Sequence, residues 1–321
     1  MERLAIISIL SFLFTLIGTK YLKEYLEKKK IFDIPSNRSS HLKPIPKGGG
    51  WIIVLILIIS IFLDSEFKKV DLKAISLPLL SVLSLAVLSW IDDIKNLNVS
   101  IRLFFQFLII CTFWILNPTP ADLGQAIIFT IISVWFINIF NFMDGIDGIT
   151  PSVSITILLG YAIAVYELNK FVDMTFCFVI ISSCFGFLLW NWHPAKIFLG
   201  DVGSITLGWL IFFSLLILYK YGKWDWALSL PMYYILDTSI TLINRFIEGK
   251  KIWQAHNEHY YQKAVQSGMS HSQVVKLIIA LQILIITTCY FIENPYLVVF
   301  LAFLQCTGLI IYFSSKYKKS T

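Results

Sequence analysis

The sequence has little charge and no long polar stretch. Only 14% of its 321 residues are Asp, Glu, Lys or Arg, whereas 57% are hydrophobic. Soluble domains carry charge on about a quarter of their residues, so this composition excludes an ordinary soluble protein and indicates a chain mostly surrounded by lipid. Because no polar segment is long enough to form a second unit, we interpret residues 1–321 as a single integral membrane domain.

Cysteines and secretory features are also scarce. The five cysteines all fall inside apolar runs, where we expect them to pack as small side chains rather than to form disulfides. The first apolar run ends without a small-residue cleavage pattern, and Lys20 and Lys23 follow it. It is therefore interpreted as an uncleaved first span.

Long apolar runs make up most of the chain. A helix needs about 20 apolar residues to cross the hydrocarbon layer, so these runs predict an all-α, polytopic transmembrane helix bundle of about eleven spans. Ten is the alternative count, because the run over 49–63 is short and the break at Asn294–Pro295 can be a kink. The runs are 4–19, 49–63, 74–91, 101–117, 124–140, 149–166, 171–190, 202–219, 226–246, 273–292 and 295–313.

Lysine and arginine are distributed unevenly between alternate loops. One set of loops holds most of the 26 basic residues, and short loops rich in Lys and Arg remain in the cytoplasm. We therefore predict a plasma (inner) membrane protein with its N-terminus outside and its C-terminus in the cytoplasm. The net charge of +6 then reflects topology and attraction to anionic membrane lipids, with no reason to expect a nucleic-acid partner.

The unusual polar segments all fall in the loops assigned to the cytoplasm. Asp92 and Asp93 end an apolar span, where the helix dipole and their mutual repulsion disfavour two carboxylates. We expect a cation to compensate them, although a solvated cap explains an isolated pair equally well. Asp144 and Asp147 lie three residues apart in a glycine-rich segment, so one helical turn would place both on one face. Turn chemistry alone is the alternative.

Two later segments combine small, polar and basic residues. Phe198-Leu-Gly-Asp-Val-Gly-Ser204 opens an apolar run, where backbone amides suit a phosphate and Asp201 suits a shared metal ion, although a lone copy is also a good helix cap. His256 and His259 lie near several bases, which favours phosphate over zinc, and an interfacial amphipathic segment is compatible with the same residues. Oxygen ligands and bases without nearby thiolates suit magnesium and phosphates. These residues predict phosphoryl transfer on the cytoplasmic face.

Taken in order, the motifs resemble those of the polyprenyl-phosphate N-acetylhexosamine 1-phosphate transferases, the superfamily of MraY and WecA (glycosyltransferase family 4). The resemblance covers most of the chain, from about residue 36 to residue 260. Its pieces are Arg38-x-Ser-His41 with Pro46-Lys-Gly-Gly49, Asp92-Asp93, Asn141-x-x-Asp-Gly-Ile-Asp-Gly-Ile149, Pro194-Ala-x-x-Phe-Leu-Gly-Asp-x-Gly-Ser204 and the histidine motif.

The resemblance implies a role for each matching residue. The catalytic residues would be Asp92, Asp93 and Asp144, with one of the adjacent pair acting as a base on the lipid phosphate or orienting it. Mg²⁺, with Mn²⁺ as the alternative, would be held by Asp201 and Asn141. The nucleotide would be bound by Asn191, Asp147 and Phe198, the last stacked on uracil. The phosphates would be contacted by His256, His259, Arg38, His41 and Lys47.

The resemblance also implies the reaction: transfer of an N-acetylated amino-sugar 1-phosphate from a UDP-sugar to undecaprenyl phosphate, with release of UMP. An in-line attack and a two-step route through an aspartyl intermediate both fit these residues. His256-Asn-Glu-His259 departs from the family's His-x-His-His, which favours initiation of O-antigen (lipopolysaccharide), capsule or other cell-envelope glycans over peptidoglycan. The alternative is a transporter or flippase, whose acids would lie mid-span. A homodimer is left open.

Overall fold

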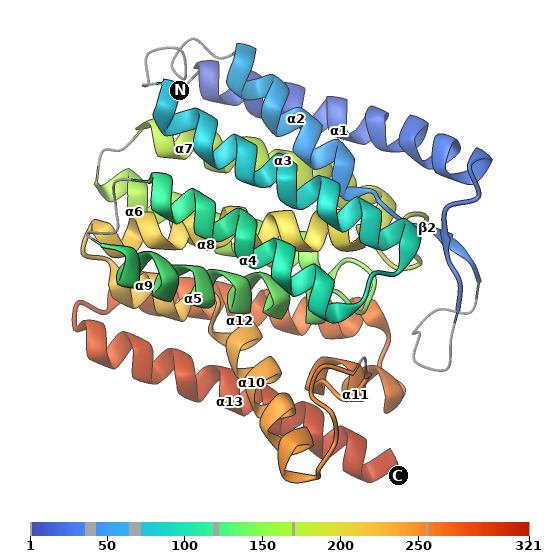
Figure 1. The fold of residues 1–321 in the computed structure, drawn as a ribbon. Coiled ribbons are helices and arrows are strands. Elements are labelled where there is room, and N and C mark those ends of the chain that lie inside the picture. Colours follow the sequence, from blue (N-terminus) through green and yellow to red (C-terminus); the bar gives the residue numbers. More distant parts are fainter. Residues whose placement is uncertain are drawn as a thin grey trace.

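The computed structural model describes residues 2–35, 43–63, 72–117, 122–168, 171–254 and 256–320. These residues form a bundle of long helices lying side by side, with one short β-ladder at one end (Figure 1), which confirms the predicted all-α polytopic architecture. The elements are α1 (Glu2–Lys28), β1 (Phe32–Asp33), β2 (Ile45–Pro46), α2 (Gly50–Leu63), α3 (Leu72–Lys95), α4 (Val99–Leu116), α5 (Leu123–Phe142), α6 (Ile149–Glu167), α7 (Phe171–Asn191), α8 (Gly200–Lys220), α9 (Trp224–Ser229), α10 (Met232–Ile247), α11 (Tyr260–Gln266), α12 (His271–Phe291) and α13 (Pro295–Ser320).

Nine helices of the described chain are long and apolar enough to cross a membrane: α1, α3 to α8, α12 and α13. The apolar helix α2 is shorter. The run over 226–246 does not form the single helix we expected, because the chain breaks at Leu230-Pro231 between α9 and α10, and proline lacks the amide hydrogen that continues a helix. The two termini lie at opposite ends of the bundle (Figure 1), while the total span count and the sidedness remain predictions.

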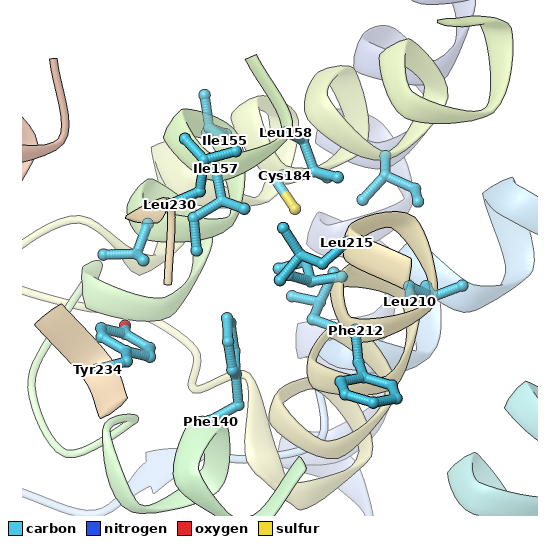
Figure 2. Close-up of a cluster of buried hydrophobic side chains, with 14 of the residues drawn as sticks. Phe140, Ile155, Ile157, Leu158, Cys184, Leu210, Phe212, Leu215, Leu230 and Tyr234 are labelled. Carbon is cyan, nitrogen blue, oxygen red and sulfur yellow. The ribbon is translucent and has the colours of Figure 1, made fainter. Parts of the chain in front are cut away.

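The centre of the bundle is formed by α6 and α8. Their spanning segments are 83% and 78% buried, against 17% for α1 at the periphery. Helix α6 packs against α7 and α8, and α8 packs against α3 and α5. Figure 2 shows the resulting apolar cluster, with Leu158 of α6, Leu210 and Phe212 of α8, and Phe140 of α5.

Hydrogen bonds between side chains join neighbouring spans. Trp209 Nε1 donates to Ser81 Oγ at 2.8 Å, and Asn138 Nδ2 donates to Gln106 Oε1 at 2.8 Å. Such bonds help to hold membrane helices together, because lipid supplies little hydrophobic drive for helices to associate. The five cysteines, all within the described residues, form no disulfide, as predicted.

The polar loops meet at the end of the bundle that carries β1 and β2. Phe198 N donates to Pro46 O at 2.8 Å, and Gly49 N donates to Phe198 O at 2.9 Å. The segment before α2 is thereby joined to the loop before α8. At the same end, Gly148 N donates to Asn191 Oδ1 at 3.0 Å, which joins the start of α6 to the end of α7. Segments far apart in sequence are thus held around one space.

Candidate active site

A cavity of about 260 Å³ lies among these loops. Most of the predicted site residues that the structure describes are on its wall. They are Lys47, Asp93, Asn141, Asp144, Asp147, Asn191, Phe198 and Asp201. Asp92, His256 and His259 are not on the wall, and Arg38 and His41 lie outside the described residues.

Asp92 is compensated by a cation, as its position at the end of α3 predicted. Asp92 Oδ2 lies 3.0 Å from Nη1 of Arg102, and Asp92 Oδ1 accepts a hydrogen bond from Leu97 N at 2.7 Å. The same Nη1 atom lies 3.3 Å from Asp201 Oδ2. Arg102, at the start of α4, therefore bridges two of the predicted carboxylates.

The side chain of Asp93 caps the N-terminus of α8. Its two carboxylate oxygens accept hydrogen bonds from Asp201 N and Val202 N, each at 3.3 Å, and Lys47 Nζ lies 3.6 Å from Oδ1. The positive end of the helix dipole favours a carboxylate here. Gly200 permits this approach, because it has a φ of +74° and an added Cβ would lie 2.8 Å from Asp93 Oδ2.

Asn141 joins the end of α5 to the same carboxylate cluster. Its Nδ2 donates to Asp201 Oδ2 at 3.4 Å, while its Oδ1 accepts from Ser204 Oγ at 2.9 Å. In this orientation the amide nitrogen faces Asp201. A metal ion beside Asp201 would require the opposite amide orientation, which a hydroxyl at Ser204 can accommodate because it both donates and accepts.

The donor set around Asp201 fits a divalent cation of the magnesium type. Asp93, Asn141 and Asp201 offer only oxygen atoms once the amide is turned, and Mg²⁺ prefers oxygen ligands. Lys47 and Arg102 are the cations that form ion pairs with Asp92, Asp93 and Asp201 within the described chain. The three carboxylates thus exceed the two cations, which leaves negative charge for a bound ion.

Asp144 lines the same cavity as this cluster and the nucleotide-binding residues predicted from the sequence. Its removal from water, together with the nearby charge of Asp93, raises the pKa of Asp144 to about 7. A carboxyl group of this kind can exchange a proton near neutral pH. This is consistent with the catalytic role predicted for Asp144.

Asp147 is held by two histidines that the motif comparison did not assign. Its Oδ2 lies 2.6 Å from His193 Nδ1 and 3.3 Å from His271 Nδ1, and accepts from Ala195 N at 3.2 Å. Burial alone would raise the pKa of Asp147, but its contacts with the rings of His271 and His193 outweigh it and hold that pKa below its ordinary value. Asp147 Oδ1 is buried without a hydrogen-bond partner among the described residues.

These three side chains also form a potential metal site, since their ligand atoms lie within 4.8 Å of one another. Imidazole nitrogens suit transition metals, whereas carboxylate and carbonyl oxygens suit magnesium. The cluster of Asp147, His193 and His271 therefore differs in chemistry from the predicted magnesium ligands.

Asn191 and Phe198 also line the cavity. Asn191 Oδ1 accepts from Gly148 N at 3.0 Å, and its Nδ2 donates to Ile197 O at 2.9 Å. Its amide therefore holds two loops together. Phe198 lies on the cavity wall, with its backbone bonded to the segment before α2.

His256 and His259 are stacked on each other, with ring centroids 4.9 Å apart. His259 is only 2% exposed, and its Nδ1 lies 3.2 Å from Oδ1 of Asp237. Burial, the neighbouring His259 and the charge of Arg245 lower the pKa of His256 to about 4. His256 is therefore uncharged at neutral pH, and a contact with phosphate would have to come from the neutral ring.

The sequence reasoning missed Arg102, Asp237, His193 and His271 as organising residues. Asp237 had a recognisable signal, because an acid inside an apolar run is costly unless it has partners. Arg102 was interpreted only as part of a basic loop. The two histidines stand alone in the sequence and acquire a common partner only through the fold.

Comparisons with known proteins agree with this arrangement. The model of the family described as "Glycosyl transferase family 4" matches residues 75–219. Over 297 residues the chain is 28% identical to the probable undecaprenyl-phosphate N-acetylglucosaminyl 1-phosphate transferase of Bacillus subtilis (strain 168), covering 87% of this chain and 82% of the relative.

Two streptococcal relatives are named phospho-N-acetylmuramoyl-pentapeptide-transferase. The Streptococcus suis (strain 05ZYH33) protein is 28% identical over 247 residues, which cover 67% of this chain and 73% of the relative. The Streptococcus gordonii protein is 26% identical over 295 residues, which cover 81% and 88%. With most of the described motif residues on one cavity, these likenesses support the polyprenyl-phosphate hexosamine 1-phosphate transferase superfamily for this chain.

Proposed function

We propose that this multi-pass membrane protein transfers an N-acetylated amino-sugar 1-phosphate from a UDP-sugar to undecaprenyl phosphate and releases UMP. The observation that carries the proposal is the meeting of Asp93, Asn141 and Asp201, from three different helices, on one cavity. Asp201 contacts both of the others, through its backbone amide to Asp93 at 3.3 Å and its carboxylate to Asn141 at 3.4 Å.

Within this cavity, an oxygen of the lipid phosphate forms a bond to the β-phosphorus of the donor. The bond from the β-phosphorus to the bridging oxygen breaks, and that oxygen leaves as part of UMP. Asp93, which unlike Asp92 lines this cavity, orients the lipid phosphate or accepts its proton, and Lys47 places positive charge beside the phosphates. Arg102 holds Asp92 and Asp201 in place. Holding both reactants in line supplies much of the rate enhancement expected for such a transfer.

Asp201, Asp93 and the turned amide of Asn141 are the residues that would hold Mg²⁺, or Mn²⁺ in its place. When bound, such an ion neutralises charge on the donor pyrophosphate. The same residues position the start of α8, where the Asp93 carboxylate accepts hydrogen bonds from the amides of Asp201 and Val202.

Asp147 and Phe198 bind the nucleotide, with Asn191 holding the loops that carry them. The cavity faces the cytoplasm in the topology predicted from the basic loops. The product starts a lipid-linked envelope glycan such as O-antigen or capsule. An acetamido sugar is supported by the relative whose name specifies N-acetylglucosaminyl transfer.

Release of UMP tests the proposal directly. Purified full-length protein is incubated with Mg²⁺, undecaprenyl phosphate and a panel of UDP-sugars that includes acetamido sugars and the muramoyl-pentapeptide donor. We expect UMP release with at least one acetamido donor and a loss of about 100-fold or more in Asp201→Asn.

Asp122→Asn is the matched control for charge removal. Asp122 caps the start of α5 through a 2.8 Å bond from Gln125 N, far from the cavity, and asparagine can make the same cap. This variant should retain full activity. The proposed function is wrong if wild-type protein releases no UMP with any donor, and the metal assignment is wrong if Asp201→Asn turns over normally.

A further inference from the structure

Gln262 is an uncharged side chain on the wall of the candidate active site, and none of the matched motifs includes it. It lies in the first turn of α11 and lines the cavity together with Asp144 and Gly145. Its side chain is partly exposed. The other cavity residues that carry the proposed chemistry are mostly acids or amides from the matched loops, so Gln262 adds a group from a separate element.

The position of the Gln262 amide is fixed from two sides. Its Oε1 accepts a hydrogen bond from His259 N at 3.3 Å. Because this bond uses the oxygen, the Nε2 group is the part of the amide that can donate to a ligand. Nε2 lies close to the loop that carries Asp144, since a Cβ added at Gly145 would be 2.7 Å from Nε2. Glycine at this position leaves room for the Tyr261 hydroxyl and the Gln262 amide to approach the backbone closely.

The first turn of α11 is itself anchored. Asp237 accepts hydrogen bonds from Tyr260 N at 3.0 Å and from Tyr261 N at 3.1 Å, and Tyr261 Oη donates to Phe142 O at 3.0 Å. Gln262 thus projects from a turn that is bonded both to α10 and to the end of α5. A side chain held in this way loses little further freedom when it binds a ligand.

The chemistry around Gly145 suits an uncharged group better than a phosphate. Nε2 of Gln262 donates hydrogen bonds, and the carboxyl group of Asp144 on the same wall accepts them. An acetamido group has one carbonyl oxygen and one N–H, so it can satisfy both. A phosphate would receive one neutral donor and would face the acid.

We propose that Gln262 is a specificity-determining residue, which donates from Nε2 to the acetamido carbonyl oxygen of the donor sugar. This inference rests on the proposed function, because it takes the donor to be a nucleotide-activated amino sugar. It assigns sugar recognition to α11 and leaves recognition of the nucleotide to Asp147 and Phe198.

The test compares two donors that carry the same charge, UDP-N-acetylglucosamine and UDP-glucose. Their dissociation constants are measured on full-length protein in detergent with Mg²⁺ and without lipid phosphate, and the preference is the ratio of the two constants. Gln262→Glu keeps the oxygen that accepts from His259 N but removes the donor. Gln262→Met removes both. The negative charge added in Gln262→Glu affects the binding of both donors equally, because they carry the same charge. Its effect therefore cancels in the ratio of the two dissociation constants.

We expect wild-type protein to prefer the acetamido donor and both variants to lose about fivefold of that preference, the effect of one neutral hydrogen bond. UDP alone should keep the same affinity in wild-type protein and in Gln262→Met. The inference is overturned if wild-type protein shows no preference, or if Gln262→Glu keeps the wild-type ratio while Gln262→Met alone changes it, since Gln262 would then only cap α11.

Release of UMP by the wild-type protein is recorded in parallel and separates the two proposals. Discrimination between the donors that depends on Gln262, without release of UMP, would reject the proposed transfer and retain the recognition role. Release of UMP together with a wild-type ratio of dissociation constants in Gln262→Glu would support the proposed transfer and reject the recognition role of Gln262.

Discussion

Two aspartates at the same end of the bundle are each paired with histidine, yet their surroundings differ. Asp147 lies between α5 and α6 and contacts His193 and His271. Asp237 lies on α10 and contacts His259. Both carboxylates are almost removed from solvent, with relative exposures of 6% and 0%.

The hydrogen bonds to each carboxylate distinguish the two clusters. Asp237 Oδ1 accepts from Tyr260 N, and its Oδ2 accepts from Tyr233 Oη at 3.0 Å and from Tyr261 N. Both of its oxygens are therefore occupied by the protein. Asp147 lines the cavity and keeps Oδ1 without a partner among the described residues. A buried carboxylate with unused acceptor capacity indicates a ligand site, whereas a saturated one indicates a structural role.

The largest effect is expected from Asp237→Asn. The amide would turn a donor toward backbone N–H groups or the Tyr233 hydroxyl, and α11 would lose the charge that binds its first turn. We expect unfolding of the purified protein to become easier by about 3 kcal/mol, measured by detergent-induced unfolding followed through tryptophan fluorescence. A variant as stable as the wild-type protein would show that Asp237 is not structural.

Asp147→Asn should give a smaller effect of a different kind. The loss of one charge-assisted acceptor is expected to weaken UMP binding by about tenfold or more, measured by titration calorimetry, with less loss of stability than in Asp237→Asn. If Asp147→Asn left UMP affinity unchanged and destabilised the protein as much as Asp237→Asn, the two clusters would have the same role.

His271→Gln tests whether the histidines beside Asp147 position this carboxylate for ligand binding. Glutamine can still accept from Asp147 N, which donates to His271 Nδ1 at 3.2 Å, but it cannot replace the ring that lies against His193, with ring centroids 4.7 Å apart. We expect a rise in the KM for the donor of about threefold to tenfold with little change in kcat, because His271 acts through Asp147 rather than on the reacting atoms. An equal fall in kcat with unchanged KM would contradict this positioning role.

The helices and most cavity residues were predictable because they depend on short-range patterns. Apolar runs give spans, and Asn141-x-x-Asp-Gly-Ile-Asp or Gly-Asp-Val-Gly-Ser is recognisable within a few residues. The contacts that make the site were not predictable in this way. Asp93 and the Asp201 amide are 108 residues apart, and their meeting depends on how α3 packs against α8.

The sequence was least informative where the same residue pattern is compatible with two different structures. The apolar run over 226–246 read as a single span, so the break at Pro231 and the buried Asp237 were both overlooked. The contact of His259 with phosphate, which was inferred from the basic residues around it, stays a prediction. The structure buries His259 against Asp237, and nothing in the local sequence specifies which way the ring turns.

The smallest expected effect concerns His256, whose ring lies against His259, the histidine that contacts Asp237. Its ring contacts His259 and lies near Arg245, Glu258 and Asp237, and its pKa falls from an ordinary 6.5 to about 4 in the folded protein. Between these values the unfolded chain takes up a proton that the folded protein does not, so stability must fall as the pH is lowered from about 7 toward 4.

His256→Gln removes this titration while keeping an acceptor for Glu258 N, which donates to His256 Nδ1 at 3.4 Å. The fall in melting temperature between pH 7 and pH 5 should therefore be smaller in the variant than in the wild-type protein, by roughly 2 °C because the ring is only half buried. Identical pH dependence of wild-type and His256→Gln proteins would mean that folding does not lower the pKa of His256.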